Sequence, residues 1–361
     1  MTSSDARPAP AASRRRWLIA LPFAALVLLG IGWSFVWQWS AGRAEAEIDA
    51  WIAREAAEGR NWACASREFG GFPFRFELIC NAPTVTFTGP EPWTARMTRA
   101  HAVAQVWNPQ HIIAEFEGPS VLTQGTSGRE ITATWSLLQV SGVGREGRAE
   151  RVSISANDYS LAEGGTTVFS ARHAELHVRH HPGEAAGTLD IALGFTGASG
   201  MALSATPRTA GVAAAQAAAQ AAKSVDGEMQ ASVTQVPPFR SMPAAERLAL
   251  WQQAGGRVQL QIARITGGGG ALSASGELGL DAQRRPDGRV DLAVVKAQPL
   301  FAAMAAAGLL PDFLANLAPA MMMAGMPTTV DGQKASSFPF VFRNGQVMLG
   351  VLPLGKIGPL Y

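Results

Sequence analysis

The chain has few charged residues, few cysteines and none of the common catalytic motifs. Charged residues make up 16% of its 361 residues, the formal net charge is +2, and two cysteines occur. So small a charge, without a basic stripe that carries interleaved aromatic residues, does not favour nucleic acid as a partner. No GxSxG, P-loop or HExxH pattern is present, and no CxxC pair indicates a metal site. We therefore predict a protein that is not an enzyme, without catalytic residues, cofactor or metal ion.

Apolar and turn-forming residues are abundant instead. Hydrophobic residues make up 47% of the sequence, which is enough to bury a core. The sequence also has 38 glycines and 22 prolines among many Val, Thr, Phe and Trp residues. This composition favours strands joined by turns over a helical bundle, so we expect a mainly β fold.

Residues 17–39 form an apolar run that is long enough to cross a membrane as a helix. The run contains no charged residue, and about 20 apolar residues span the roughly 30 Å hydrocarbon core of a bilayer. Arg14, Arg15 and Arg16 precede the run and acidic residues follow it. The positive-inside rule therefore places residues 1–16, a predicted disordered tail, in the cytoplasm and nearly all of the remaining chain outside.

A cleaved signal peptide is the alternative, with the Ala-Glu-Ala at 44–46 as its cleavage site. The apolar run, however, is longer than the roughly 7 to 15 residues of a signal peptide. Trp33, Trp37 and Trp39 are typical of an aromatic belt at the outer membrane interface. Both features favour an uncleaved anchor, followed by a short amphipathic helix at 44–58.

Both cysteines, Cys64 and Cys80, lie outside the membrane on this topology. An oxidising compartment favours a disulfide between them, and closing a loop of about 15 residues contributes roughly 3 kcal/mol in the chain-entropy model. A pair of buried thiols or a metal half-site is the alternative, although no nearby histidine supports metal. The alternation of residues 74–80 predicts a strand with one buried face, entered through a Gly-Gly-Phe-Pro turn.

Alternating runs between turn signals predict consecutive antiparallel strands in a first β-rich lobe, residues 40–200. The candidate strands are 84–88, 93–97, 103–107, 112–116, 131–139, 151–156, 167–180 and 188–195. Residues 201–227 are rich in alanine and are predicted to form a linker or an exposed helix.

A second β-rich lobe is predicted at residues 228–361, and it either shares one sheet with the first lobe or forms its own. Leu248 and Trp251 indicate a short amphipathic helix that ends at a pair of glycines. Asp287-Gly288 and Asn344-Gly345 are both predicted to be tight hairpin turns.

Two motifs that resemble functional sites have simpler explanations. Residues 142–147 match GxGxxG, but a strand pattern follows them where a nucleotide-binding loop needs a helix, so we predict a Gly-rich hairpin. His173, Glu175 and His177 fall on one face of a predicted strand, where a metal site is conceivable. The polar face of a half-buried strand explains these three residues without a ligand.

Residues 298–326 are apolar and rich in Ala and Met, and two prolines divide them into two predicted short helices. Flexible thioethers suit an adaptable surface that contacts lipid or a protein partner, whereas an apolar stripe is ordinarily core. Both interpretations stay open at this stage. The candidate lipid or partner surface consists of Phe301, Met304, Leu309, Phe313, Leu317, Met321, Met322 and Met323.

The single span, GGFPFRFELIC at residues 70–80 and the ending VLPLGKIGPLY at 351–361 resemble the bacterial family called domain of unknown function 2125. This resemblance implies a protein of the bacterial cell envelope, and the predicted topology then gives an inner-membrane protein whose bulk lies in the periplasm. Residues 271–294 and 343–350 are similar to strand pairs in AsmA-like envelope proteins. The second resemblance implies an inner-membrane span followed by a long, curved antiparallel β-sheet, groove-like or sandwich-like, that shelters lipids.

Two functions follow from these expectations. The first is an inner-membrane anchored periplasmic β protein that binds or shelters lipid or another amphiphile along an apolar sheet face. The alternative is a structural or assembly protein that binds protein partners of the cell envelope.

Overall fold

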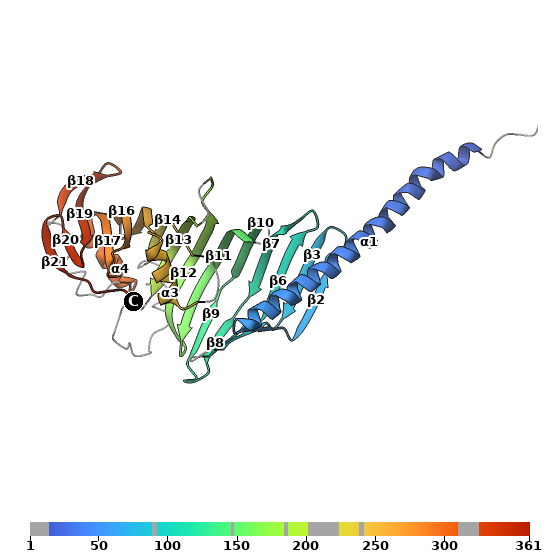
Figure 1. Cartoon of the computed structure of the whole chain (residues 1–361), viewed down its shortest axis with the longest axis horizontal. Helices are drawn as coiled ribbons and strands as arrows, with labels where there is room; N and C mark the ends of the chain where they lie inside the picture. Colours follow the sequence, from blue (N-terminus) through green and yellow to red (C-terminus); the bar gives the residue numbers. More distant parts are fainter. Residues whose placement is uncertain are drawn as a thin grey trace, which may run out of the picture.

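The protein consists of a long N-terminal helix and one large antiparallel sheet (Figure 1). The structure, a computed structural model, describes residues 14–88, 92–145, 148–183, 187–200, 224–237, 242–309 and 325–361. Helix α1 spans Arg14–Ala57 without a break, so the predicted span and the predicted amphipathic helix after it are one helix. The predicted mainly β fold is confirmed.

Long passes of chain, each bent into two strands, build the first part of the sheet. Each pass pairs with the next one along the chain, on both sides of its bend. Their strands are β1 Arg60–Ala63 with β2 Ser66–Gly70, β3 Arg75–Asn81 with β4 Thr84–Phe87, β5 Trp93–Arg96 with β6 Arg99–Gln105, β7 Asn108–Glu117 with β8 Ser120–Gln124, and β9 Glu130–Thr134 with β10 Leu137–Arg145. Strand β11, Arg148–Glu163, then pairs with β10 along its first half and with β9 along its second half.

The bends of neighbouring passes lie beside one another and form a crease across the sheet. Pro83 and Pro119 stand at two of the bends, where the missing N–H interrupts the ladder. Ala82 has φ of 45° and Asp158 in β11 has φ of 50°, a left-handed conformation that breaks the pleat. The Ala82 N–H donates to the carbonyl of Thr98 (2.9 Å), so adjacent passes stay joined at the crease.

The second part of the sheet continues the meander with longer, mostly unbroken strands. Strand β19 pairs with β17 along one edge and with both β18 and β20 along the other. The strands are β12 Thr166–His180, β13 Leu189–Gly200, β14 Val225–Val233, β15 Val258–Gly267, β16 Gly270–Leu280, β17 Pro286–Val295, β18 Met326–Val330, β19 Gln333–Arg343, β20 Gln346–Leu349 and β21 Leu352–Lys356. Two short helices, α3 Ala244–Gln253 and α4 Ala297–Ala306, lie within this part, and the predicted helix around Trp251 is confirmed.

The sheet runs without interruption past the Ala-rich segment, because β13 pairs directly with β14. The predicted linker at 201–227 is therefore wrong at its end, since residues 225–227 belong to β14. Residues 201–223 lie outside the described residues. The sequence does not predict β14 because Gly227 and small neighbouring side chains weaken its alternation.

The predicted hairpin turn at Asp287-Gly288 is wrong. The turn between β16 and β17 lies at 281–285, where the Asp281 carboxylate accepts the backbone N–H groups of Gln283 (2.9 Å) and Arg285 (3.0 Å). A carboxylate that bonds its own loop in this way stabilises the turn locally. Gly288 instead sits inside β17 with φ of 144°, where an added Cβ would lie 2.1 Å from a backbone oxygen of β16.

Two other sequence predictions are confirmed. Asn344 and Gly345 have φ of 51° and 73° and join β19 to β20 in a two-residue turn, as a type I′ hairpin requires. Gly142 and Gly144 of the GxGxxG sequence lie in β10, and Arg145 pairs with Arg148 of β11, so the described part of the sequence belongs to a Gly-rich hairpin, while residues 146 and 147 lie outside the described residues.

Candidate functional site

One face of the sheet is apolar across nearly its whole length. Residues that stand opposite each other on antiparallel strands share a face, so the strand register identifies rows of side chains that cross the sheet. Two neighbouring rows contain only apolar residues and glycine, and together they define the apolar face. The first row is Phe76, Ala104, Ile112, Gly142, Val152, Val178, Ile191, Ala231, Leu260, Gly276, Val290, Phe340 and Leu349. The second row is Leu78, Ala102, Ala114, Val140, Ile154, Leu176, Leu193, Met229, Ala263, Ala274, Leu292 and Phe338.

The opposite face of the same strands is mostly polar. One row that crosses it is Ile79, His101, Glu115, Gln139, Ser155, Glu175, Gly194, Glu228, Arg264, Ser273, Ala293 and Ser337. The sheet is therefore amphipathic, with one face suited to water and the other to an apolar neighbour.

Helices cover the two ends of the apolar face. At the first end, Trp37 and Ala41 of α1 form a buried cluster with Phe76 of β3. At the second end, Leu300 and Phe301 of α4 are buried against the strands that carry Val294 and Phe338. The C-terminal end of α4 extends this cover towards β12, β13 and β14 through a second buried cluster.

The middle of the apolar face, between these helices, is more exposed. Ile112 on β7 is 48% exposed and Leu193 on β13 is 38% exposed. Val140, Ile154 and Leu176 between them are only partly buried. Six neighbouring strands cross this part, in the order β6, β7, β10, β11, β12 and β13. At a strand spacing of roughly 4.8 Å, the distance from the first to the last of them is about 24 Å.

Helix α1 projects beyond the sheet at one end and packs on it at the other (Figure 1). From Ala20 it is long and apolar enough to cross a membrane, and its most apolar 18-residue window has a mean hydropathy of 1.9 and no buried residue. From residue 20 onward, Trp33 is the first residue of α1 that is not exposed, and its indole N–H donates to the carbonyl of Pro73 (2.9 Å). Trp37 follows, donating to the carbonyl of Arg75 (3.2 Å).

The predicted aromatic belt of three tryptophans is wrong for Trp37. Its side chain is only 8% exposed because it packs on the sheet, edge-on to Phe72 and beside Phe76. Trp39 does face outward, 66% exposed, with the guanidinium of Arg43 5.2 Å from its ring centre. The tryptophans therefore serve partly to fasten α1 to the sheet.

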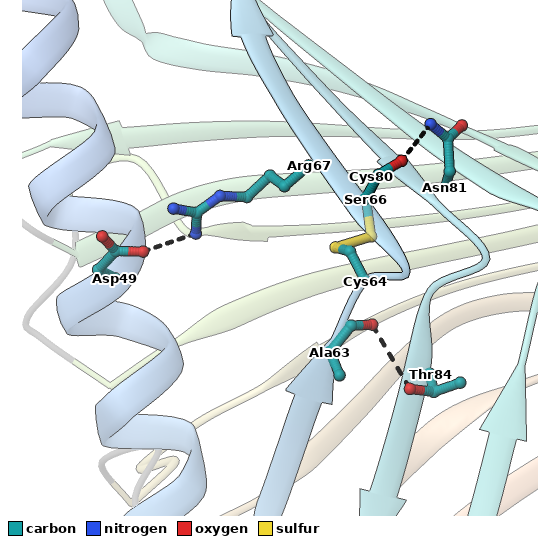
Figure 2. Close-up of a disulfide and its surroundings, with 8 residues drawn as sticks. All are labelled: Asp49, Ala63, Cys64, Ser66, Arg67, Cys80, Asn81 and Thr84. Atoms are coloured by element: carbon teal, nitrogen blue, oxygen red, sulfur yellow. Dashed lines mark hydrogen bonds and ion pairs between the residues drawn. A yellow bond between two sulfur atoms is a disulfide. The ribbon is translucent and has the colours of Figure 1, made fainter.

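An ion pair fastens the second half of α1 to the first strands, which a nearby disulfide joins to each other (Figure 2). Asp49 of α1 forms an ion pair with Arg67 of β2 at 2.6 Å. Cys64 and Cys80 form the predicted disulfide, with a Cα–Cα distance of 5.4 Å, which joins the link between β1 and β2 to the end of β3. The disulfide thus fixes the strands on which α1 lies.

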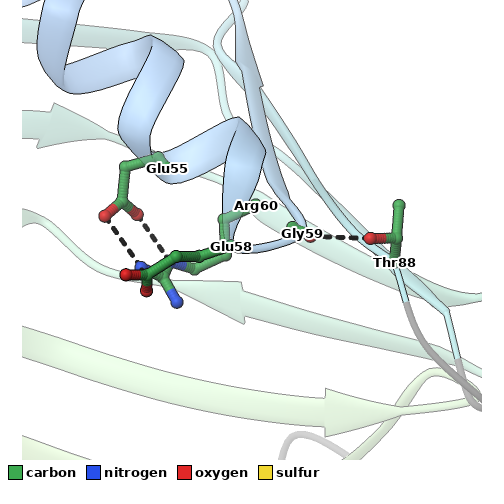
Figure 3. Close-up of polar contacts among 5 residues, drawn as sticks. All are labelled: Glu55, Glu58, Gly59, Arg60 and Thr88. Atoms are coloured by element: carbon green, nitrogen blue, oxygen red, sulfur yellow. Dashed lines mark hydrogen bonds and ion pairs between the residues drawn. The ribbon is translucent and has the colours of Figure 1, made fainter. Parts of the chain in front are cut away.

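Another ion-pair group closes the junction between α1 and β1 (Figure 3). The guanidinium of Arg60 binds Glu55 at 2.5 Å and Glu58 at 2.7 Å. The side-chain hydrogen bond from Arg60 lowers the pKa of Glu55, although desolvation opposes this shift. The Gly59 carbonyl accepts the N–H of Thr88 (2.8 Å), so the turn after α1 is also held to the end of β4.

Comparison with known proteins then places the chain in a family. A profile of uncharacterised proteins conserved in bacteria, DUF2125, matches residues 37–358. The chain belongs to the DUF2125 family. The match begins at Trp37, where α1 packs on the sheet. Searches of the curated proteins and of the solved structures found no match, so the likeness to AsmA-like proteins has no support from the comparisons.

Three residues of the candidate lipid or partner surface lie in the part of this DUF2125 chain that the structure describes. Phe301 is 7% exposed, and Met304 and Leu309 pack against buried clusters, so these residues are core that covers the apolar face. The other predicted members, Phe313, Leu317, Met321, Met322 and Met323, lie outside the described residues.

The predicted row of His173, Glu175 and His177 lies on the polar face of β12. His173 Nδ1 is 2.7 Å from the side-chain oxygen of Asn157, and His177 Nδ1 is 2.9 Å from the hydroxyl of Ser153. The Glu175 carboxylate lies 3.3 Å from His177 Nε2. These contacts pair the row with β11, and the described residues contain no group of three or more His, Cys, Asp or Glu side chains that could hold a metal ion.

A cavity of about 430 Å³ lies between α3 and the β16–β17 turn, lined by Gln252, Asp281 and Arg284 among others. Gln252, Asp281 and Arg284 are engaged within the chain. Burial raises the pKa of Asp281, but hydrogen bonds from the Arg285 side chain and backbone outweigh that effect and lower it. The Tyr361 hydroxyl donates to the Gln252 side-chain oxygen (2.7 Å), so the C-terminal residue is held at this place.

Sequence reasoning predicted an apolar sheet face and identified individual strands, but not the rows of residues that form the face. Many of its residues are alanine or glycine, such as Ala102, Ala104 and Ala114, which carry a weak hydrophobic signal. Only the strand register places them in rows with Ile, Leu and Val. A search for neighbouring strands whose even or odd positions all lack polar groups would have found it.

Proposed function

We propose that the protein is a non-catalytic, membrane-anchored β protein that binds or shelters lipid, or another amphiphile, along the middle of the apolar face. The observation that carries this proposal is the continuity of the face, since two rows of apolar residues cross the sheet while its middle stays partly exposed. An exposed apolar surface of this length is unusual in soluble proteins unless it meets a ligand or a partner.

The size of the exposed part fits acyl chains. Its roughly 24 Å length at the strand spacing exceeds half of the roughly 30 Å hydrocarbon thickness of a bilayer, which is the length that one layer of acyl chains fills. Alanine and glycine along the rows, such as Ala104, Ala114 and Gly142, leave shallow places between larger side chains. No polar side chain from the two rows would meet the chain of a lipid lying there.

We propose further that α1 is an uncleaved anchor in the bacterial inner membrane, with the arginines before it in the cytoplasm and the sheet in the periplasm. The packing of Trp37 and Ala41 supports an uncleaved helix. Cleavage at 44–46 would remove both residues and expose Phe69 and Phe76, which they cover. Exposing two aromatic side chains is unfavourable, so the cluster favours retention.

Neighbouring isoleucines on β7 provide a matched test. Ile112 lies on the apolar face and Ile113 on the polar face, and they are 48% and 39% exposed. We predict that Ile112→Asp lowers the amount of lipid that co-purifies with the full-length chain at least about ten-fold, because it sets a carboxylate against acyl chains. Lipid per protein is measured by mass spectrometry after extraction from membranes.

Ile113→Asp is the control and should keep lipid within about two-fold of the wild type, because its side chain points away from the apolar face. Circular dichroism confirms that both variants are folded. A wild-type chain without lipid, or an equal loss in both variants, would contradict lipid binding on this face.

The exposed C-terminal edge supports a second candidate, a role in binding protein partners of the envelope. All residues of β21 are exposed, and Leu352 and Leu354 lie on this edge strand beside Val351, which is 97% exposed. Such an edge can pair with a strand of another protein. A photo-crosslinker at Leu354 that captures one defined protein in cells, while Ile112→Asp leaves the capture unchanged, would favour this candidate.

A further inference from the structure

Three large aromatic side chains are exposed at one end of the sheet. Phe72 and Phe74 lie in the turn between β2 and β3, and Trp107 lies in the turn between β6 and β7. Their exposed fractions are 54%, 60% and 65%. These three residues are called the aromatic rim. Exposed aromatic side chains grouped in this way indicate a surface that meets something apolar.

The aromatic rim is continuous with the first contact between α1 and the sheet. The ring centre of Phe74 lies 6.5 Å from that of Trp33 and 6.3 Å from that of Trp107. Phe72 lies edge-on to Trp37 at 5.5 Å. The rim therefore touches α1 at the point where the helix stops being fully exposed.

The length of α1 sets the height of the rim relative to a bilayer. Trp33 lies 16 residues after Trp17, or about 24 Å along a helix that rises roughly 1.5 Å per residue. The hydrocarbon core is roughly 30 Å thick, so a span that starts at Trp17 reaches its far boundary about four residues after Trp33. A turn that bonds to Trp33 is consequently at the level of that boundary, and tilt of the helix would place it deeper.

We propose that the aromatic rim inserts into the outer interface of the bilayer that α1 spans. Phe and Trp side chains are favoured at this level, where an apolar ring is partly shielded from water. The proposal commits to lipid because the rim and the apolar half of α1 form one continuous surface. It rests on the proposed anchor role of α1.

Insertion of the rim gives the apolar face an opening at the membrane. Ala104 and Ile112 flank the turn that carries Trp107. Both residues belong to the first row of the apolar face and follow Phe76, the residue that α1 covers. Acyl chains can therefore pass from the outer leaflet onto the face without crossing water.

Spin labels on the full-length chain in lipid nanodiscs test the depth of the rim. Both native cysteines form the disulfide, so an introduced cysteine can be labelled selectively. The test variants are Phe74→Cys and Trp107→Cys, which change exposed side chains. Phe23→Cys, at a 70% exposed position of α1, reports on the span, and Val351→Cys, at the opposite end of the chain, is the aqueous control.

We expect nitroxides at 74 and 107 to collide with dissolved oxygen more often than with a water-soluble nickel complex, giving a ratio several-fold higher than at 351. Water-like values at 74 and 107, with a membrane-like value at 23, would overturn the rim proposal while leaving the anchor intact. A water-like value at 23 would overturn the anchor and, with it, the rim. If the rim labels become protected only when a periplasmic extract is added, the rim meets a protein and the proposal is wrong.

Discussion

At the scale of single residues, Asp190 shows how the polar face is held together. Its carboxylate accepts hydrogen bonds from the Ser232 hydroxyl (2.8 Å) and Arg179 (3.1 Å), and lies 2.8 Å from His181 Nδ1. These groups come from β14 and from the end of β12, so one side chain of β13 ties three strands together. Burial raises the pKa of Asp190, but the hydrogen bonds from His181, Ser232 and Arg179 outweigh it and lower the pKa below its ordinary value of 3.8.

We predict that Asp190→Asn lowers the free energy of unfolding at neutral pH by about 1 to 2 kcal/mol, because it removes charge-assisted hydrogen bonds. A carboxylate whose pKa is lowered on folding stabilises the protein at pH values above its unfolded pKa. That stabilisation is lost as the pH falls through the folded pKa. The wild type should therefore lose more stability than the variant between about pH 5 and pH 2, as measured by denaturant unfolding.

Asp291→Asn is the matched control, since Asp291 pairs with Arg289 two residues away on the same strand and both side chains are substantially exposed. An exposed pair of this kind contributes about 0 to 1 kcal/mol. Equal effects of the two substitutions would show that the Asp190 contacts do not stabilise the sheet.

At the scale of secondary-structure elements, the packing of α1 on β3 depends on Trp37. We predict that Trp37→Ala weakens this packing by about 3 kcal/mol, because it removes a buried aromatic ring and leaves a cavity. Hydrogen exchange of the amides in residues 33–57 should become about 100-fold faster in the full-length protein. Trp39→Ala, at a position 66% exposed, should change the exchange rate by less than about five-fold.

If both tryptophan variants exchanged at the wild-type rate, α1 would not depend on this contact in solution. The same result would remove the structural argument against cleavage, because the cluster of Trp37, Ala41 and Phe76 would then contribute little. The hydrogen exchange of this segment is therefore informative about the anchor as well.

Some elements could be predicted from the sequence because their signals are local. The Asn344-Gly345 turn needs positive φ at both residues, and the sequence has the two residue types that tolerate it. The Asp287-Gly288 prediction failed because Gly288 meets a different need, the close approach of β16. From sequence alone, a glycine required by a turn and a glycine required by a neighbouring strand look the same.

The crease and the rows of the apolar face could not be predicted because they are properties of neighbouring strands. A single bend, such as that at Pro83 or Pro119, reads as the end of a strand. Its role appears only when the bends of adjacent passes come together. Likewise, the sequence left the role of the Met-rich segment open, because apolar residues such as Phe301 and Met304 occur both in a core and on a surface that contacts lipid. The structure places these two residues in and against a buried cluster.

At the scale of the whole molecule, the projecting part of α1 and the open part of the apolar face belong to one arrangement. In the proposed function, α1 holds the sheet beside the membrane, and the apolar face receives lipid that leaves the bilayer. We predict that the chain isolated from bacterial membranes keeps its N-terminal segment, because residues 33–41 are part of the fold. Intact-protein mass spectrometry should give the mass of the full chain, with or without its first methionine.

A variant in which residues 44–46 are changed to a strong signal-peptidase site provides the control, because it gives the mass of a cleaved chain from the same cells. Recovery of a native chain that begins near residue 47 would contradict the anchor. It would leave the apolar face without its cover at β3.

The order of strands in the sheet also determines how the chain can fold while it is being synthesised. From β1 to β17, each pass pairs with the pass before it, and every pairing is antiparallel. As the chain grows from its N-terminal end, each new strand therefore finds its partner already in place, beginning with the first strands beside α1. Contacts of low sequence separation favour rapid folding and leave few strand edges waiting for later residues. A sheet of this length can thus be completed stepwise from α1 outward, one hairpin at a time.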